Sequence, residues 1–170
     1  WKTQDLGEDA ILTTAQFIDA NHAVITGEFG TVLTSTDAGA SWQAQPPMPN
    51  EFYPYAAWFA DAQTGWVSGL AGVILHTADG GKTWTPQTNP TAAPMYALVP
   101  VGAELYGLGA GGRMVRLHDQ QWVAFEHGKR IPAHLAAGAA LDERSMLLVG
   151  AGGALSPINL PARAALAASR

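Results

Sequence analysis

The sequence contains no cysteine, and only 14% of its 170 residues are charged. The absence of cysteine excludes disulfide bonds, thiolate metal sites and a cysteine nucleophile. The formal net charge of −5 provides no basic surface of the kind that nucleic acids or anionic membranes bind. These two absences exclude several classes of function before any motif is considered.

Long apolar runs are also missing, since no segment approaches the roughly 20 apolar residues needed to span a bilayer. The chain has neither an initiator methionine nor a signal peptide ahead of Trp1, which favours a processed, trimmed or excerpted product. Hydrophobic residues are abundant, at 48%. A chain of this length and composition is expected to bury the core of one domain.

An eight-residue pattern occurs twice, as STDAGASW at residues 35–42 and as TADGGKTW at residues 77–84. Both copies place a hydroxyl residue, an aspartate, a glycine and a tryptophan at the same spacing, and Asp79 follows Asp37 by 42 positions. Residues 17–42 also align without a gap to residues 59–84, sharing Phe-x-Asp-Ala and Gly-x-x-Gly. This fixed period predicts an internal structural repeat.

Two weaker copies follow the first two. The third keeps Asp119 and Trp122 in a shortened pattern, and the fourth keeps only Asp142 with the glycine pair Gly150 and Gly153. The segment WKTQ at the start of the chain matches WQAQ and WTPQ, which follow the two full patterns. We therefore expect one propeller domain or portion over residues 1–170, with units at about residues 5–46, 47–88, 89–126 and 127–170, and residues 1–4 as an outer strand.

Each unit is expected to form short strands between glycine-bearing turns. In the second unit, aromatic and β-branched residues predict strands at residues 55–60, 65–69, 73–77 and 82–85. Four strands in about 40 residues, repeated, are typical of propeller blades. The sequence therefore predicts an all-β propeller of about four units. Two architectures stay open: a closed four-bladed ring, or part of a larger propeller completed by further sequence or by a second copy.

The eight-residue pattern is interpreted as a folding device. Its aspartate is expected to accept backbone N–H groups across the hairpin between the third and fourth strands. Its glycine supplies a backbone angle that side chains resist, and its tryptophan fixes the hairpin to the sheet. The structural residues are Ser35, Asp37, Gly39 and Trp42 in the first copy and Thr77, Asp79, Gly81 and Trp84 in the second.

This pattern resembles the Asp-box, or bacterial neuraminidase repeat. The longer unit, with GWVSG and GVILHTADGGKTW, is similar to propellers of the photosystem II stability/assembly-factor type. The resemblance implies a non-enzymatic scaffold that binds another protein, such as a subunit of a membrane or envelope complex. It also implies an extracytoplasmic location: the periplasm or outside the cell, or the thylakoid lumen in a photosynthetic organism.

The alternative function is a carbohydrate-active or carbohydrate-binding propeller of the sialidase type. Sialidases need an arginine triad, a Tyr/Glu nucleophile pair and an acid/base aspartate. The aromatic-Arg-Ile-Pro element of that family is absent, since Lys129 precedes Arg130-Ile131-Pro132. No catalytic residue is therefore assigned, and the protein is not expected to be an enzyme.

Cofactor and metal sites are not expected either. The segment GLGAGG at residues 107–112 fits a dinucleotide-binding pattern, but it coincides with the Gly-x-x-Gly of the third unit and precedes a strand. The five histidines show no metal-ligand spacing. The aspartates of the boxes are interpreted as turn-forming residues rather than as metal ligands.

Two connections between units are candidate binding segments. The first, residues 45–58, holds Tyr53, Tyr55 and Trp58 among prolines, and exposed aromatic side chains are common binding anchors. We expect Tyr53 and Tyr55 to be substantially exposed, whereas the structural alternative places two or three of the rings in the core. The second, residues 126–134, holds the basic pair Lys129 and Arg130, which would suit an acidic, extended segment of a partner.

Overall fold

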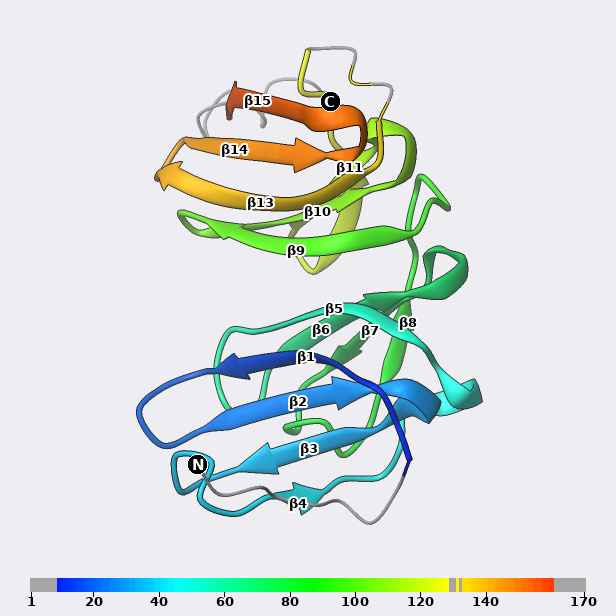
Figure 1. Ribbon diagram of the computed structural model, residues 1–170, viewed down its shortest axis with the longest axis vertical. Coiled ribbons are helices and arrows are strands. Elements are labelled where there is room, and N and C mark those ends of the chain that lie inside the picture. Colours follow the sequence, from blue (N-terminus) through cyan, green and yellow to red (C-terminus); the bar gives the residue numbers. More distant parts are fainter. Residues whose placement is uncertain (1–8, 129–130, 132, 161–170) are drawn as a thin grey trace.

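The structure, a computed structural model, describes residues 9–128, 131 and 133–160. Its strands form four sheets, and neighbouring strands in each sheet follow one another along the chain. All of these neighbours are antiparallel. We number the sheets 1 to 4 in chain order; Figure 1 shows sheets 1 and 2 in the lower half of the molecule and sheets 3 and 4 in the upper half.

Sheet 1 consists of β1 (Leu12–Phe17), β2 (Ala23–Gly27), β3 (Val32–Ser35) and β4 (Gln43–Ala44). Sheet 2 consists of β5 (Pro54–Phe59), β6 (Gly65–Gly69), β7 (Ile74–Thr77) and β8 (Thr85–Gln87). Sheet 3 consists of β9 (Met95–Val101), β10 (Glu104–Gly109), β11 (Met114–His118) and β12 (Gln121–Ala124). Sheet 4 consists of β13 (Leu135–Asp142), β14 (Ser145–Gly150) and β15 (Ala154–Asn159). Short 3₁₀ turns are η1 (Glu28–Gly30), η2 (Pro49–Glu51), η3 (Leu70–Gly72), η4 (Ala110–Gly112) and η5 (Ala151–Gly153).

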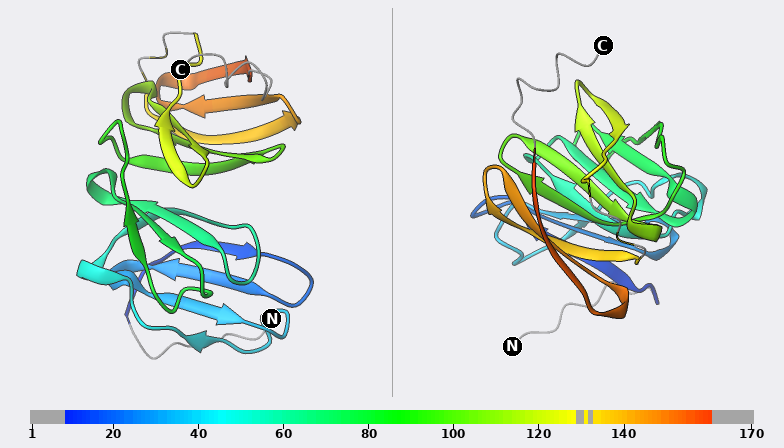
Figure 2. Two further views of the ribbon diagram at one scale, coloured as in Figure 1. Left: turned by 180° about the vertical axis from the view of Figure 1, so that it is seen from behind. Right: turned by 90° about the horizontal axis from the view of Figure 1, so that it is seen from above.

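The four sheets confirm the predicted all-β propeller repeats. Their first strands lie side by side, β1 against β5, β5 against β9 and β9 against β13. The ring is not closed, because Figures 1 and 2 show sheets 1 and 4 at opposite ends of the described chain. The structure is therefore that of part of a propeller, as the second of the two architectures anticipates.

Three apolar clusters hold the sheets together, one at each junction between neighbours. At the first junction, Val24 and Val32 of sheet 1 pack with Phe59, Val67 and Leu75 of sheet 2. Because the alternate residues of a strand face opposite sides of its sheet, each central sheet contributes apolar residues to both of its neighbours. Face-to-face packing of successive sheets is thus the main source of apolar burial in the fold.

A side-chain amide also joins the first two sheets. The Gln16 side chain on β1 donates to the carbonyl oxygen of Phe59 and accepts from its N–H, both at 2.8 Å. These two bonds satisfy the N–H and the carbonyl oxygen of Phe59, which lie on the edge of β5 that has no neighbouring strand in sheet 2.

The second strand of every sheet ends in the first glycine of the Gly-x-x-Gly pattern. A Cβ at Gly69 would lie 2.1 Å from the carbonyl oxygen of Tyr53, so only glycine fits this approach. The second glycine, Gly72, has a φ of +76°, which glycine adopts without strain. The pattern at residues 107–112 has the same geometry in sheet 3, where it forms the connection between β10 and β11.

The Asp-box of sheet 2 forms a closed hydrogen-bond network. The Asp79 carboxylate accepts from the backbone N–H groups of Lys82 and Thr83, at 3.0 and 2.9 Å, and from the Thr83 hydroxyl at 2.6 Å. The Thr77 hydroxyl donates to Asp79 at 2.9 Å and accepts from the N–H of Gly81. Ser35, Asp37, Gly39 and Ser41 repeat most of these bonds in sheet 1.

This network explains one wrong boundary in the sequence analysis. The outer strand of sheet 2 was expected at residues 82–85, but β8 begins at Thr85. The N–H groups of Lys82 and Thr83 donate to Asp79, so these two residues belong to the turn and not to the strand. In sheet 3, a two-residue turn replaces the box: Asp119 and Gln120 have φ values of 46° and 65°, as in a type I′ hairpin.

We expect Phe59→Ala to lower the free energy of unfolding by about 3–5 kcal/mol, the range for truncating a buried phenylalanine. Phe59 is 2% exposed and packs between sheets 1 and 2. The matched control is Phe29→Ala, because Phe29 is 60% exposed and should lose less than about 1 kcal/mol. Urea denaturation of both variants checks the difference, and equal losses would contradict the proposed packing.

The Asp-boxes should make the folding stability depend on pH in the acid range. Hydrogen bonds from Thr83 and from Ser41 lower the pKa values of Asp79 and Asp37 from 3.8 to about 2. Between pH values of about 4 and 2 the unfolded chain therefore binds more protons than the folded protein does. The stabilisation by the two carboxylates is complete above this window and is lost as the pH falls through it. Thermal unfolding should therefore show a deficit in an Asp37→Asn/Asp79→Asn variant at neutral pH that shrinks towards pH 2. The exposed Glu143→Gln serves as a control, and a pH-independent deficit would contradict the assignment.

Candidate functional site

One end of the sheets carries the connections that lead into β5, β9 and β13, together with the turns η1, η3, η4 and η5. We call this end the linker face. The opposite end, the box face, carries the Asp-boxes and the hairpins between the first and second strands of each sheet, on the left in Figure 1. The two faces differ because each sheet's first strand starts at the linker face and ends at the box face.

Four aromatic rings form a continuous row on the linker face, and we call them the tyrosine row. The centroids of Tyr53 and Tyr55 are 5.8 Å apart, those of Tyr55 and Tyr96 5.4 Å, and those of Tyr96 and His134 5.9 Å. Tyr55 and Tyr96 lie in β5 and β9, whereas Tyr53 and His134 directly precede β5 and β13, so the row crosses the starts of three successive inner strands. Edge-to-face and tilted contacts of this kind stabilise aromatic pairs beyond the area that they bury.

A β-bulge places the central rings. In each of the four inner strands the pairing register slips by one residue near the linker face. The unpaired residues are Thr13 in β1, Tyr55 in β5, Tyr96 in β9 and Ala136 in β13. Bulges re-aim side chains and are frequent beside functional sites. The repeated bulge thus presents one side chain from each sheet at the same height, and two of these are tyrosines.

The backbone ahead of each inner strand is fixed by the neighbouring 3₁₀ turn. The N–H of Leu70 in η3 donates to the carbonyl oxygen of Tyr53 at 3.1 Å, and the N–H of Ala151 in η5 donates to that of His134 at 2.9 Å. The His134 side chain makes a further contact, since its Nδ1 accepts from the N–H of Gly111 at 3.2 Å. Both ends of the tyrosine row are therefore held by backbone hydrogen bonds.

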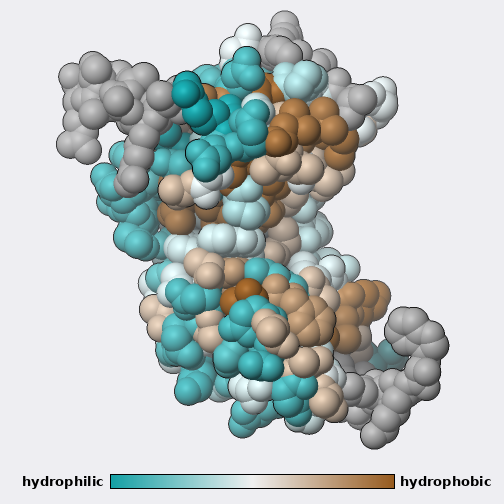
Figure 3. Space-filling view, turned by 90° about the vertical axis from the view of Figure 1, so that its left-hand side faces the viewer, coloured by the Kyte–Doolittle hydropathy of each residue, from teal (hydrophilic) through white to brown (hydrophobic). Residues whose placement is uncertain are grey.

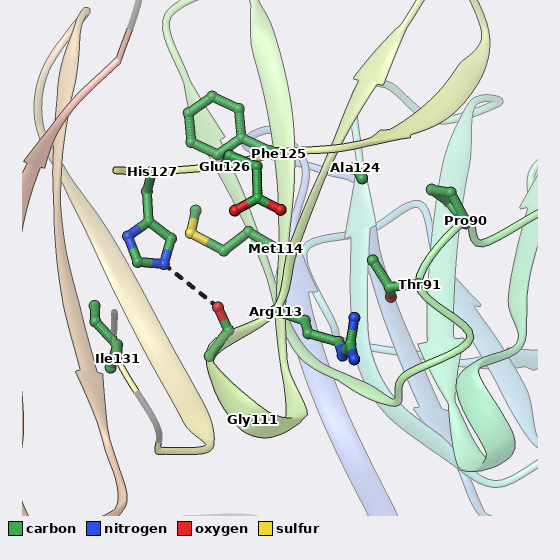
Figure 4. A pocket seen from close by; sticks show the side chains of 11 residues that line it. Pro90, Thr91, Gly111, Arg113, Met114, Ala124, Phe125, Glu126, His127 and Ile131 are labelled. Carbon is green, nitrogen blue, oxygen red and sulfur yellow. Dashed lines mark hydrogen bonds between the residues drawn. The ribbon is translucent and has the colours of Figure 1, made fainter. Parts of the chain in front are cut away.

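An open pocket of about 410 Å³ lies on the linker face beside this row. Figure 4 shows Arg113 and Thr91 on one side of it and His127 and Ile131 on the other, with Glu126 and Met114 between them. His127 Nε2 lies 3.4 Å from the carbonyl oxygen of Gly112. Its Nδ1 is buried and has no hydrogen-bond partner among the described residues. The turn η4 joins the pocket to the row, because Gly111 lines the former and donates to His134 of the latter.

The predicted binding residues are distributed over different places. Tyr53 and Tyr55 lie in the row but are half-buried, less exposed than expected, because each ring packs against its neighbours. Trp58 is outside the row: it stacks on Trp66 with centroids 5.8 Å apart, in the cluster between sheets 2 and 3. Lys129 and Arg130 lie outside the described residues.

The sequence analysis missed Tyr96 and His134. Tyr96 holds the same bulge position in β9 that Tyr55 holds in β5, so the repeat carried a signal for it. His134 lies in the candidate segment 126–134 but was not singled out there, although its position ahead of β13 is equivalent to that of Tyr53 ahead of β5.

Residues 1–95 match the sequence family described as Photosynthesis system II assembly factor YCF48, which is more than half of the chain. The chain belongs to this family. No curated protein matches the sequence.

Solved structures agree on the fold. The structure titled "YCF48 bound to D1 peptide" is 19% identical with a TM-score of 0.64, over 88% of this chain and 53% of that one. YCF48 from Cyanidioschyzon merolae is 16% identical with a TM-score of 0.68, over 94% of this chain and 59% of that one. This member of the YCF48 family therefore spans little more than half the length of those two structures.

An enzyme shares the fold as well. A catalytically inactive virginiamycin B lyase from Staphylococcus aureus is 13% identical with a TM-score of 0.65, over 83% of this chain and 49% of that one. The described arginines of this chain do not converge: Arg113 lines the pocket, Arg144 lies in a box-face hairpin, and Arg116 is buried 3.6 Å from Glu104. Among the described residues, no group of three or more histidines and acidic residues is arranged to hold a metal ion.

The close approach at Gly69 gives a test of how the row is positioned. Gly69→Ala should lower the melting temperature clearly, because the new methyl group must displace the backbone of Tyr53. Gly111→Ala is the matched control, since its Cβ meets nothing within 4 Å and Ala71 already occupies the equivalent position with a φ of 57°. Differential scanning calorimetry of both variants checks the prediction; similar stability losses would count against it.

Proposed function

We propose that this protein is a non-enzymatic scaffold that binds a segment of another protein along the tyrosine row. The single observation that carries the proposal is the contiguity of Tyr53, Tyr55, Tyr96 and His134 on one face. Tyrosine offers a large, rigid ring and a hydroxyl group that both donates and accepts hydrogen bonds. These properties make it a frequent anchor at protein interfaces.

The shape of the row suits an extended segment. Its three ring-to-ring steps together have about the length of five residues of an extended chain, at roughly 3.3 Å per residue. The neighbouring pocket offers polar groups of both charges, Arg113 and Glu126, to side chains at one end of such a segment. The three tyrosines of the row are half-buried and need little ordering on binding, because packing already restrains their rings.

Membership in the YCF48 family supports a role as an assembly or stability factor for a membrane or envelope complex. A YCF48 structure has been solved with a D1 peptide, which supports a protein segment as the ligand class here. No helix in the described part of the chain is long and apolar enough to cross a bilayer. The proposal includes an extracytoplasmic site of action, which the family resemblance supports.

A binding selection tests the proposal. Peptides displayed on phage are selected on the native protein, and their affinities are then measured for a Tyr55→Ala/Tyr96→Ala variant. We expect a loss of about 30-fold or more, equivalent to about 2 kcal/mol, as for interface anchors. Melting temperatures establish that the variant remains folded.

Two controls separate the ring from other effects. Tyr55→Phe/Tyr96→Phe retains the ring area and should retain most of the affinity. Lys82→Ala removes an exposed side chain on the box face and should leave affinity unchanged. Peptides that bind the double alanine variant as tightly as the native protein would refute a site on the tyrosine row.

A further inference from the structure

Equivalent positions of the repeat differ sharply in exposure at the two ends of the structure. Phe59 in sheet 2 is 2% exposed, whereas Phe17, its equivalent in sheet 1, is 65% exposed. Val101 in sheet 3 is 2% exposed, whereas Leu141, which lies equally far from the start of its inner strand in sheet 4, is 56% exposed and is left unpaired by a register shift between Ala140 and Asp142. Both buried members lie in clusters between neighbouring sheets. The exposed members therefore mark the places where the next sheet would pack.

The open surface of sheet 1 is the one that every later sheet turns towards its predecessor. Ala15 is paired with Ile25 across β1 and β2, as Ala57 is paired with Val67 across β5 and β6. Ala57, Phe59 and Val67 pack against sheet 1. We call the surface of Ala15, Phe17 and Ile25 the rear face.

The open surface of sheet 4 is the one that each earlier sheet turns towards its successor. Ala137 pairs with Val149 and Ala139 pairs with Leu147, as Ala97 pairs with Leu108 and Val99 pairs with Tyr106 in sheet 3. The sheet 3 residues pack against sheet 4. We call the surface of Ala137, Ala139, Leu141, Leu147 and Val149 the forward face.

The two faces are matching halves of one kind of interface. Each junction within the chain joins the forward face of one sheet to the rear face of the next, and these residues of both open faces are uncharged. In Figure 3, brown apolar surface is visible on the right-hand side of both the upper and the lower half of the molecule. Exposed apolar surfaces of this kind mark interaction sites.

We propose that a second copy of this chain covers both open faces, so that two copies close a ring with two-fold symmetry. The forward face of each copy packs on the rear face of the other, which continues the junctions already present within the chain. Two copies of four sheets form an eight-bladed ring, within the usual range of four to eight blades.

Pairing of unlike faces gives a closed particle only if each copy turns the chain through half a circle; otherwise it gives an open filament. In a closed ring of two copies, each copy uses its forward face in one junction and its rear face in the other. A charge placed on either face therefore damages both junctions of a ring made of identical copies.

Sedimentation velocity of the 170-residue chain at micromolar concentrations tests the ring. We expect a particle of twice the 17.8 kDa chain mass. Phe17→Asp and Leu141→Asp should each weaken dimerisation by about 30-fold or more, because each buries charge at two junctions. Phe29→Asp and Leu70→Asp are matched controls with 60% and 56% exposure on the linker-face turns, and both should remain dimeric.

A mixture of the two interface variants tests the head-to-tail pairing. A ring of one Phe17→Asp copy and one Leu141→Asp copy keeps one undamaged junction, so the mixture should dimerise more strongly than either variant alone. Pairing of like faces would give no such recovery. A monomeric native chain, a polydisperse assembly, or a dimer insensitive to both interface variants would each overturn the closed ring. None of these outcomes bears on the tyrosine row, which lies on a different face.

Discussion

The approach of each 3₁₀ turn to the backbone ahead of the inner strand organises both the fold and the site. In sheet 2 the N–H of Leu70 donates to the carbonyl oxygen of Tyr53, and Gly69 leaves no Cβ in the way. The same bond occurs in the other three sheets, between Glu28 and Ile11, Ala110 and Pro94, and Ala151 and His134. An unpaired carbonyl at a strand end would otherwise depend on solvent. The contact therefore determines where every inner strand begins.

The bulge and the tyrosine row follow from that anchor. Once the strand start is held on the turn, one extra residue must be accommodated before regular pairing resumes, and this residue is Tyr55 in β5 and Tyr96 in β9. Its side chain is aimed out of the ladder instead of into a junction between sheets. The same device carries Thr13 and Ala136 in the end sheets. The scaffold is thus repeated, whereas the chemistry that it presents differs from sheet to sheet.

Most of the fold could be predicted from the sequence because its determinants are local and periodic. The Asp79 network closes within seven residues, 77–83, and the Gly69 and Gly72 positions recur at the repeat period. The start of β8 could not be predicted, because the Asp79 carboxylate accepts the N–H of Thr83, which is then not available for pairing with the neighbouring strand. The contact between His134 and Tyr96 could not be predicted either, because it forms only through the packing of sheets 3 and 4.

The contrast between Phe17 and Phe59 shows that the repeat alone does not predict burial. Identical side chains stand at equivalent positions of equivalent strands, yet one is a core residue and the other is open to solvent. The repeat specifies the shape of a surface, while burial depends on which surface lies opposite. Apolar burial at about 25 cal/mol per Å² favours covering such a face with whatever matches its shape. The forward face of sheet 4 is the natural counterpart, because its residues occupy the positions from which sheets 1 to 3 contact their successors.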